Sequence, residues 1–311
     1  MVGFRCKSTI NMDNNANQVL DIKQFAINIE EFIHTSAKDV LSKINSIEIV
    51  SSKDDGANPT TNFDQEIERG LRDMVLEKYS GYDIGIVGEE FPLENDETSK
   101  YTIYIDPIDG TKYFAQGVPL WTTSIALTEK TDEANSEAAL YAAIYHPSAN
   151  DLYIAITGQG AFHNGTKMNV KDVPAAKAQI ALDFAISDDI IFAYNQSKTF
   201  YTPTGQKIGN NWQAYRDSVE AGITRLRRAF YRVRDLGSGT LATAWTAKGM
   251  YLAYVLPAEH LNKRVDHIGG LLLIKEAGGS IIYTHLTDQI NYAIAASTQE
   301  VCEQIKALLE Y

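Results

Sequence analysis

The stretch YTIYIDPIDGTKYFA, which begins at Tyr101, constrains the fold more than any other part of the chain. Its first five residues alternate aromatic and β-branched side chains, which predicts a strand. Two acids, Asp106 and Asp109, follow this strand, with a proline that stiffens the turn and Gly110, which lets the backbone approach a ligand. Because this spacing can direct both carboxylates and the Ile108 carbonyl at a hard cation, the stretch predicts a metal site at a strand end.

Gly110 and Thr111 can open a helix after this turn, and the N–H groups at a helix start favour a bound phosphate. The simpler alternative is an Asx-type turn in which an Asp only caps the helix, because Asp-Gly turns are common. Phosphatases of the haloacid dehalogenase type carry a DxDGT motif, in which the first Asp attacks phosphorus. Here Pro107 and Ile108 separate the two acids, so the spacing does not fit that class.

The composition limits the kinds of partner that the chain can bind. Its 311 residues, 44% of them hydrophobic, suit one large domain or two closely packed domains. With 28 basic and 40 acidic side chains the net charge is −12, which argues against a nucleic-acid partner. The arginines from Arg225 to Arg234 are a local exception, which we interpret as the solvated face of a helix. An acidic protein that acts on a phosphate ester would need bound cations to offset the repulsion.

Cysteine content and hydropathy predict where the protein is found. Cys6 and Cys302 are the only cysteines, so the sequence contains neither a disulfide framework nor a cysteine-based zinc site. The N-terminal residues lack an apolar core of signal-peptide length, and no later apolar run reaches membrane-spanning length. We therefore expect a cytoplasmic protein that does not bind a membrane.

The pattern of elements divides the chain into three predicted parts. Residues 1–18 are polar and Asn-rich, which predicts a flexible tail. Residues 19–176 contain helical patterns at 19–44 and 65–78 and then a series of strands, which predicts an N-terminal α+β domain with an antiparallel sheet. Strands alternate with helices over residues 177–311, which predicts a C-terminal α/β domain that completes the site.

Further acids lie at the ends of predicted elements. Glu89 and Glu90 end a short apolar strand shortly before the central motif, and this strand could lie beside the strand that leads to Asp106. Asp64 and Asp266 each stand at the start of a predicted helix, where capping is the ordinary role of an acid. Local sequence alone therefore does not decide whether these acids reach the central motif.

Taken in order, these motifs resemble the inositol monophosphatase family, which also includes fructose-1,6-bisphosphatases and 3'(2'),5'-bisphosphate nucleotidases. The matching segments are a lysine followed by T-x-x-D, GEE, DPxDGTxxF, NG, LGS and a second acid motif ending in EAGG, at Lys53, 61–64, 88–90, 106–114, 164–165, 236–238 and 266–279. The second acid motif departs from the family, because Val265 replaces a tryptophan and His267 stands among the residues that replace small ones. The resemblance implies a layered αβαβα sandwich of the inositol monophosphatase and fructose-1,6-bisphosphatase type, commonly found as a homodimer.

The resemblance also implies a magnesium-dependent phosphomonoesterase with two or three Mg²⁺ ions per active site. The implied metal ligands are four carboxylates and one carbonyl, from Glu89, Asp106, Asp109, Asp266 and Ile108. Thr111 and Asp64 would act together on the attacking water, and Glu90 would assist. The implied substrate contacts are Gly110, Thr111, Gly237, Ser238, Glu259 and Lys53. His267 is interpreted as a residue that packs in the core or supports a metal ligand and not as a ligand itself, because magnesium prefers oxygen ligands.

Several functions stay open at this point. The leading hypothesis is hydrolysis of a small phosphorylated polyol or sugar, with inositol monophosphate first. Alternatives on the same scaffold are 3′-phosphoadenosine phosphate, fructose 1,6-bisphosphate and histidinol phosphate. Two hypotheses of other classes are a metal-dependent binding or regulatory protein with little turnover and an aspartyl-phosphate phosphatase.

Overall fold

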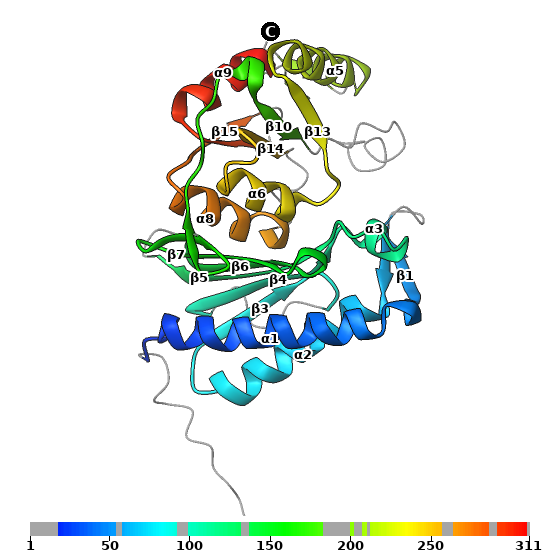
Figure 1. The fold of residues 1–311 in the computed structure, drawn as a ribbon, viewed down its shortest axis with the longest axis vertical. Coiled ribbons are helices and arrows are strands. Elements are labelled where there is room, and N and C mark those ends of the chain that lie inside the picture. Colours follow the sequence, from blue (N-terminus) through cyan, green and yellow to red (C-terminus); the bar gives the residue numbers. More distant parts are fainter. Residues whose placement is uncertain are drawn as a thin grey trace, which may run out of the picture.

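The computed structural model describes residues 18–53, 58–91, 99–131, 137–182, 200–201, 207–209, 212–256, 264–285 and 291–309. Within these ranges the elements stack in layers in the order helix, sheet, helix, sheet, helix (Figure 1). The αβαβα sandwich expected from the sequence is therefore confirmed. None of the helices in this described part of the chain combines the length and apolarity needed to cross a bilayer.

Two amphipathic helices, α1 (Ile22–Ser42) and α2 (Asn62–Tyr79), cover the outer face of the first sheet (Figure 1). The side chains of α1 that recur at helical spacing, among them Phe25 and Ile29, are buried in the core beneath the sheet. The second helix begins three positions earlier than its apolar pattern predicts. Its start is a capping box, in which the Asp64 carboxylate accepts from the N–H of the N-cap residue Thr61.

The first sheet has seven strands in sequence order, β3-β4-β5-β6-β7-β8-β9. β3 runs parallel to β4, and the other neighbouring pairs are antiparallel. The predicted neighbourhood of the two strands before the acids is therefore confirmed, with their carboxyl ends at the same edge. The strands are β3 (Ile84–Gly88), β4 (Tyr101–Asp109), β5 (Thr122–Lys130), β6 (Glu137–His146), β7 (Asp151–Ile156), β8 (Gly160–His163) and β9 (Thr166–Met168).

Two short helices, α6 (Gly239–Ala247) and α8 (Ile268–Glu276), form the central layer between the sheets (Figure 1). Both are almost entirely buried, as expected of helices that are apolar on all sides. Glu276 at the end of α8 accepts hydrogen bonds from the N–H groups of Gly158 and Gly160, at 3.0 and 2.9 Å. The EAGG motif thus joins α8 to the turn between β7 and β8.

The second sheet has five strands in the order β13-β10-β14-β16-β15. β10 runs parallel to β13 and β14, and the remaining pairs are antiparallel. Helices α5 (Trp212–Ala229) and α9 (Gln299–Leu309) cover its outer face (Figure 1). The strands are β10 (Gln179–Leu182), β13 (Arg232–Asp235), β14 (Ala253–Leu256), β15 (Ser280–His285) and β16 (Asn291–Ala296).

The shorter elements are hairpins, single turns and one short helix. They are β1 (Ile49–Lys53), β2 (Asn58–Thr61), α3 (Thr111–Ala115), β11 (Phe200–Tyr201), β12 (Lys207–Gly209) and the 3-10 turns η1 (Ile44–Ser46), η3 (Pro147–Ala149), η4 (Ala175–Lys177) and η5 (Arg264–Asp266). The first sheet ends at Met168 and the second begins at Gln179, so the predicted boundary at residues 176–177 falls between the sheets. The division into two domains stays a prediction, and residues 1–17 of the predicted tail lie outside the described residues.

The arginine-rich segment is only partly a solvated surface. Arg227 and Arg228 are exposed on α5, as predicted, whereas Arg232 and Arg234 are exposed on strand β13 and not on a helix. For Arg225 the prediction is wrong, because its guanidinium donates to the carbonyls of Leu308 and Leu309, at 2.6 and 3.2 Å. These bonds satisfy carbonyl groups at the end of α9 and fix α5 to that helix.

Candidate active site

Three carboxylates meet where β3 and β4 end. Glu89 follows β3, Asp106 lies in β4, and Asp266 comes from η5, just before α8. Each offers one oxygen, and these oxygens all lie within 4.8 Å of one another. The parallel pairing of Gly88 with Ile105 brings the first two acids together. The structure therefore unites three of the predicted metal ligands from segments that are far apart in the sequence.

Asp106 is the buried member of this group, and its surroundings disfavour the ionised form of its carboxyl. Its side chain is 2% exposed, and its Oδ1 atom has no hydrogen-bond partner among the described residues. Burial raises the pKa of this carboxyl well above its usual value, and the charges of Glu89, Asp109 and Asp266 raise it further. A buried, unsatisfied oxygen among other carboxylates is unfavourable unless a cation neutralises the group. The residues therefore fit a hard divalent cation that prefers oxygen ligands.

Asp109 lies outside this group of three and is held by the start of α6. Its Oδ2 atom accepts from the Ser238 hydroxyl at 2.7 Å, the Thr240 N–H at 2.8 Å and the Thr240 hydroxyl at 2.5 Å. Burial raises the pKa of Asp109 to about 6, although these hydrogen bonds oppose the increase. The Thr240 hydroxyl also shares a short hydrogen bond with Thr122 of β5. Sequence reasoning missed Thr240, whose signal was its place in the Gly-Ser-Gly-Thr turn.

The turn after β4 requires glycine at position 110. Gly110 has φ +90, and a Cβ atom there would lie 2.6 Å from the Leu120 carbonyl oxygen. The pairing of β4 with β5 shifts register between Asp106 and Asp109, so the two acids lie on either side of a bulge. Phe114, the last residue of the motif, is buried with its ring 4.9 Å from that of Trp121. The glycine and the phenylalanine thus shape the turn, while the acids face the site.

Thr111 and Asp64 lie close enough to act as a pair. The Thr111 hydroxyl is 2.7 Å from the Ile108 carbonyl oxygen and 3.4 Å from Asp64 Oδ1. The other oxygen of Asp64 accepts from the N–H and hydroxyl of Thr61, at 2.8 and 2.5 Å. Burial raises the pKa of Asp64 to about 7, with smaller contributions from Glu90 and Glu89. Asp64 therefore combines the predicted capping role with a position beside the central turn.

The remaining predicted residues are placed as follows. The N–H of Glu90 donates to Glu68 Oε2 at 2.9 Å, so the turn after β3 is fixed to α2. Gly237 lies against the Tyr113 ring, because a Cβ atom there would be 2.8 Å from Tyr113 Cε2. Lys53 ends β1, but its side chain and all of Glu259 lie outside the described residues. The roles predicted for these residues in catalysis and substrate binding stay predictions.

The residues that depart from the family motif lie on either side of Asp266. The N-cap position of α8 is occupied by His267, so capping is not the role of Asp266. Val265, in place of the family tryptophan, is buried against Tyr104 and Ala126. His267 is buried too, and the carboxylate group described above contains no nitrogen ligand. Val265 and Ile268 thus pack against residues of the first sheet, and the acid is kept.

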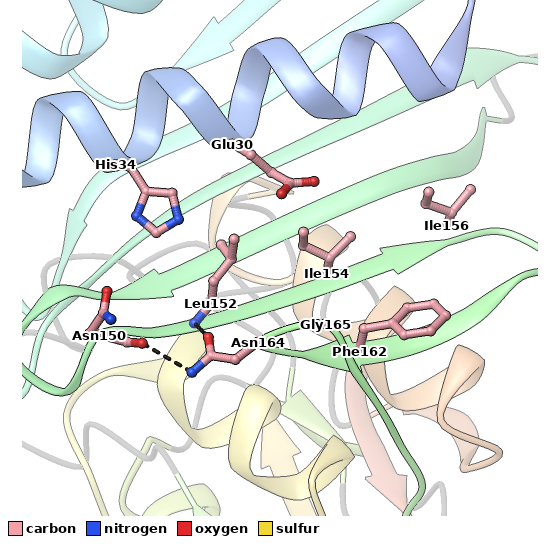
Figure 2. Close-up of a pocket in the computed structure, with 9 residues that line it drawn as sticks. All are labelled: Glu30, His34, Asn150, Leu152, Ile154, Ile156, Phe162, Asn164 and Gly165. Carbon is pink, nitrogen blue, oxygen red and sulfur yellow. Dashed lines mark hydrogen bonds between the residues drawn. The ribbon is translucent and has the colours of Figure 1, made fainter.

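A separate hollow of about 520 Å³ lies between α1 and the face of β7 and β8 (Figure 2). Glu30 and His34 of α1 line one side of it, and Ile154, Ile156 and Phe162 line the other. Burial raises the pKa of Glu30, while the charge of His34 lowers it. The hollow shares no residue with the carboxylate group, so it is separate from the predicted metal site, although Asn164 and Gly165 of the NG motif line it.

Comparison with known proteins gives a consistent family. The model of the inositol monophosphatase family matches residues 21–310. A fructose-1,6-bisphosphatase of Pyrococcus furiosus is 26% identical over 262 residues, which cover 81% of this chain and 86% of that protein. An inositol-1-monophosphatase of Caulobacter vibrioides is 28% identical over 262 residues, covering 83% and 90%. The solved inositol monophosphatase of Anabaena has the same fold, with a TM-score of 0.69 at 19% identity over 93% of this chain and 96% of that one.

The family model spans nearly the whole described chain, and the acids of its motifs converge at one edge of the first sheet. The resemblance inferred from the motifs is therefore confirmed. The chain belongs to the inositol monophosphatase family and is a phosphomonoesterase for sugar or polyol phosphates.

Proposed function

We propose that this protein hydrolyses a small phosphorylated polyol or sugar with magnesium as its cofactor. Inositol monophosphate is the leading candidate for its substrate. The observation that carries the proposal is the buried, unpartnered Oδ1 atom of Asp106 among the carboxylates of Glu89 and Asp266. This oxygen-only arrangement suits Mg²⁺ better than a metal that prefers nitrogen or sulfur. Two or three ions per site are proposed, with Asp109 and the Ile108 carbonyl as further ligands.

The bound ion would supply positive charge to the phosphate and make water a stronger nucleophile. The residues of the chain provide the positioning. Glu89, Asp106 and Asp266 would hold the ion, and the hydrogen bonds from the start of α6 fix Asp109, which would be a further ligand. The main-chain N–H groups of Gly110 and Thr111 are proposed as donors to the phosphate. Gly237 and Ser238, the latter bonded to Asp109, are proposed as substrate contacts, as are Lys53 and Glu259.

Thr111 and Asp64 are proposed to orient the attacking water. The Thr111 hydroxyl has one proton, and the Ile108 carbonyl oxygen at 2.7 Å is a better acceptor than Asp64 at 3.4 Å. When Thr111 instead donates to Asp64, its oxygen can accept a hydrogen bond from water. The raised pKa of Asp64, about 7, makes that carboxylate a stronger base than an exposed aspartate. Glu90, in the neighbouring turn, is proposed to assist.

The choice of substrate rests on the relatives. Several of them are fructose-1,6-bisphosphatases or enzymes with both fructose-1,6-bisphosphatase and inositol-1-monophosphatase activity, at 25 or 26% identity. Two inositol-1-monophosphatases are 28% identical. A histidinol-phosphatase is 35% identical, but only over 41% of this chain. We therefore place inositol 1-phosphate first and fructose 1,6-bisphosphate second.

We also propose that the enzyme is a homodimer in the cytoplasm and has no nucleic-acid partner. The dimer follows from the resemblance to the family. The net charge of −12 supports the absence of nucleic-acid binding. Size-exclusion chromatography with light scattering would give the mass of the assembly directly, and a mass near that of one 34.5 kDa chain would contradict the dimer.

The experiment is phosphate release by purified protein, with Mg²⁺ or with EDTA. The substrates to compare are inositol 1-phosphate, fructose 1,6-bisphosphate, 3′-phosphoadenosine phosphate and histidinol phosphate. The expected result is Mg²⁺-dependent phosphate release that is fastest with inositol 1-phosphate. If another compound is hydrolysed faster, that compound becomes the proposed substrate. Failure to trap a phosphoenzyme would support direct attack by water, whereas a trapped phosphoenzyme would contradict it. Folded protein that binds Mg²⁺ but turns over none of these compounds would favour a binding or regulatory protein.

A further inference from the structure

We propose that Glu68, a buried residue of α2, is a positioning residue for the acidic turn after β3 and thereby sets the affinity of the carboxylate group for Mg²⁺. The identity of the ion rests on the proposed function. The role of Glu68 rests on contacts that involve none of the expected ligand oxygens. Glu68 lies two turns beyond the start of α2, and its side chain has no exposed surface.

The Glu68 carboxylate is surrounded by hydrogen-bond donors. Oε2 accepts from the N–H of Glu90 at 2.9 Å, and Oε1 accepts from the N–H of Phe91 at 3.3 Å. Oε1 also accepts from Arg72, at 2.8 Å from Nη2 and 3.2 Å from Nε. The carboxylate thus fixes the backbone of the two residues that follow Glu89. Both carboxylate oxygens accept here, whereas an amide would place an N–H donor against one of these donor groups.

The turn is built to accept this carboxylate. At Gly88, directly before Glu89, a Cβ atom would lie 2.0 Å from Glu68 Oε1 and 2.4 Å from Oε2. Any larger residue would displace the carboxylate or the turn. The close approach of Glu68 therefore explains why the GEE motif begins with glycine. Gly88 leaves the space that the Glu68 carboxylate occupies.

Phe91 closes the turn on its other side. The guanidinium of Arg69 lies 5.4 Å from the centre of the Phe91 ring, and that of Arg72 lies 5.8 Å from it. Such contacts stabilise the ring through its negative face. One face of α2 thus holds the backbone and the side chain of the residues next to Glu89.

This arrangement has a consequence for metal binding. Glu89 lies between two anchored positions, Gly88 and Glu90, so the direction of its carboxylate follows from the backbone that Glu68 fixes. Residues that orient a metal ligand through hydrogen bonds typically change metal affinity by about 10- to 100-fold when they are replaced. The nearby charge of Glu68 is neutralised by Arg72, so its contribution is geometric and not a simple attraction for the cation.

The test measures Mg²⁺ binding to metal-free protein by isothermal titration calorimetry. Glu68→Gln keeps the size of the side chain, and we expect its Mg²⁺ dissociation constant to increase by about 10-fold or more. The matched control is Glu66→Gln, which removes the same charge from an exposed position of the same helix. The control is expected to bind Mg²⁺ within about twofold of the wild-type protein, which separates geometry from net charge.

A second variant keeps the proposal testable if Glu68→Gln does not fold. Gly88→Ala changes the turn and not the helix, and its methyl group would displace the Glu68 carboxylate. We expect a similar loss of Mg²⁺ affinity from this variant. In the double variant the two losses should not add, because each disrupts the same contact. Additive losses would show that Gly88 and Glu68 act separately and would overturn the proposal.

The outcomes also separate this proposal from the proposed function. Phosphate release by Glu68→Gln should recover to within about threefold of wild type at saturating Mg²⁺, because the catalytic groups are unchanged. A folded Glu68→Gln protein with wild-type Mg²⁺ affinity and a lower melting temperature would reduce Glu68 to a purely structural residue. If the wild-type protein binds Mg²⁺ but releases no phosphate, the proposed function fails, while the calorimetric comparison still tests Glu68.

Discussion

Thr240 donates two hydrogen bonds to one oxygen of Asp109, from its main-chain N–H at 2.8 Å and from its hydroxyl at 2.5 Å, across 131 positions of the sequence. Asp109 belongs to the turn after β4, whereas Thr240 lies in the first turn of α6. The positive end of that helix dipole faces the carboxylate and favours its ionised form. An element of the C-terminal half therefore fixes an acid of the N-terminal motif.

This contact predicts that Thr240→Val lowers kcat/KM by roughly 10- to 100-fold, because Asp109 loses one of its three donors and can rotate. Valine has the shape of threonine but cannot donate. The unfolding free energy should fall by about 1 to 2 kcal/mol. Steady-state kinetics at several Mg²⁺ concentrations and urea denaturation would measure both effects.

The control for this variant is Thr246→Val in the same helix. The Thr246 hydroxyl is buried and donates to the Ala242 carbonyl at 2.8 Å, so the control loses one buried hydrogen bond, whereas Thr240→Val also loses the contact with Thr122. The Thr246 hydroxyl donates within α6 and not to Asp109, so the kcat/KM of the control should stay within about twofold of the wild-type value. Equal losses of activity in both variants would show that the effect is one of stability alone.

Much of the site could be predicted from the sequence because its residues lie in local motifs. The strand that ends in Asp106, the glycine at position 110 and the adjacent acids after β3 each have a pattern of their own. The parallel pairing of β3 with β4 then brings Glu89 to Asp106, as expected if the two strands before the acids lie side by side. At these positions the local sequence pattern and the observed structure agree.

Other contacts could not be predicted because they depend on tertiary packing. Glu68 and Thr240 look like ordinary helix residues, and only the packing of α2 and α6 against the turns shows their partners. Asp266 could not be distinguished from an N-cap until His267 was found in that position. Arg225 was predicted to face solvent, since the sequence does not show that the end of α9 lies beside α5.

We predict that Asp106→Asn is nearly inactive yet at least as stable as the wild-type protein without metal. Burial and the neighbouring charges of Glu89, Asp109 and Asp266 disfavour the ionised form of Asp106. A neutral amide removes that repulsion, so melting in EDTA should occur at the same or a higher temperature. Activity should fall by roughly 10²- to 10³-fold or more, because a ligand oxygen with charge is lost.

The comparison for this variant is Asp73→Asn, on the exposed surface of α2. It changes the net charge equally and should change neither activity nor melting temperature measurably. A marked loss of stability in metal-free Asp106→Asn would contradict the conclusion that burial and neighbouring charges destabilise the ionised Asp106 carboxylate.

We predict that Thr111→Val loses turnover while it keeps its affinity for Mg²⁺. The hydroxyl is the group that reaches both the Ile108 carbonyl and Asp64, and valine removes only that group. A fall in kcat of roughly 10²- to 10⁴-fold is expected if the pair transfers a proton from water. Thr111→Ser should recover most of the activity, because it restores the hydroxyl. Mg²⁺ titration of both variants by calorimetry would show whether binding is preserved.

The raised pKa values predict how the stability of the metal-free protein depends on pH. The pKa is about 7 for Asp64 and about 6 for Asp109, and the main cause at both residues is burial. Because their ordinary value is about 3.8, the folded protein binds more protons than the unfolded chain between about pH 4 and pH 7. The unfolding free energy in EDTA should therefore decrease as the pH rises through this range, by up to about 7 kcal/mol, since each pKa unit corresponds to about 1.4 kcal/mol.

Mg²⁺ should reverse this dependence, because the ion binds only the ionised carboxylates and must displace their protons. Urea denaturation at about pH 5 and about pH 8, each with EDTA and with Mg²⁺, would measure it. The stabilisation by Mg²⁺ should be small at the lower pH and several times larger at the higher one. Asp64→Asn should flatten the dependence in EDTA, since it removes the group that titrates at the highest of the two values. Metal-free protein that gains stability from about pH 5 to about pH 8 would contradict the raised pKa values.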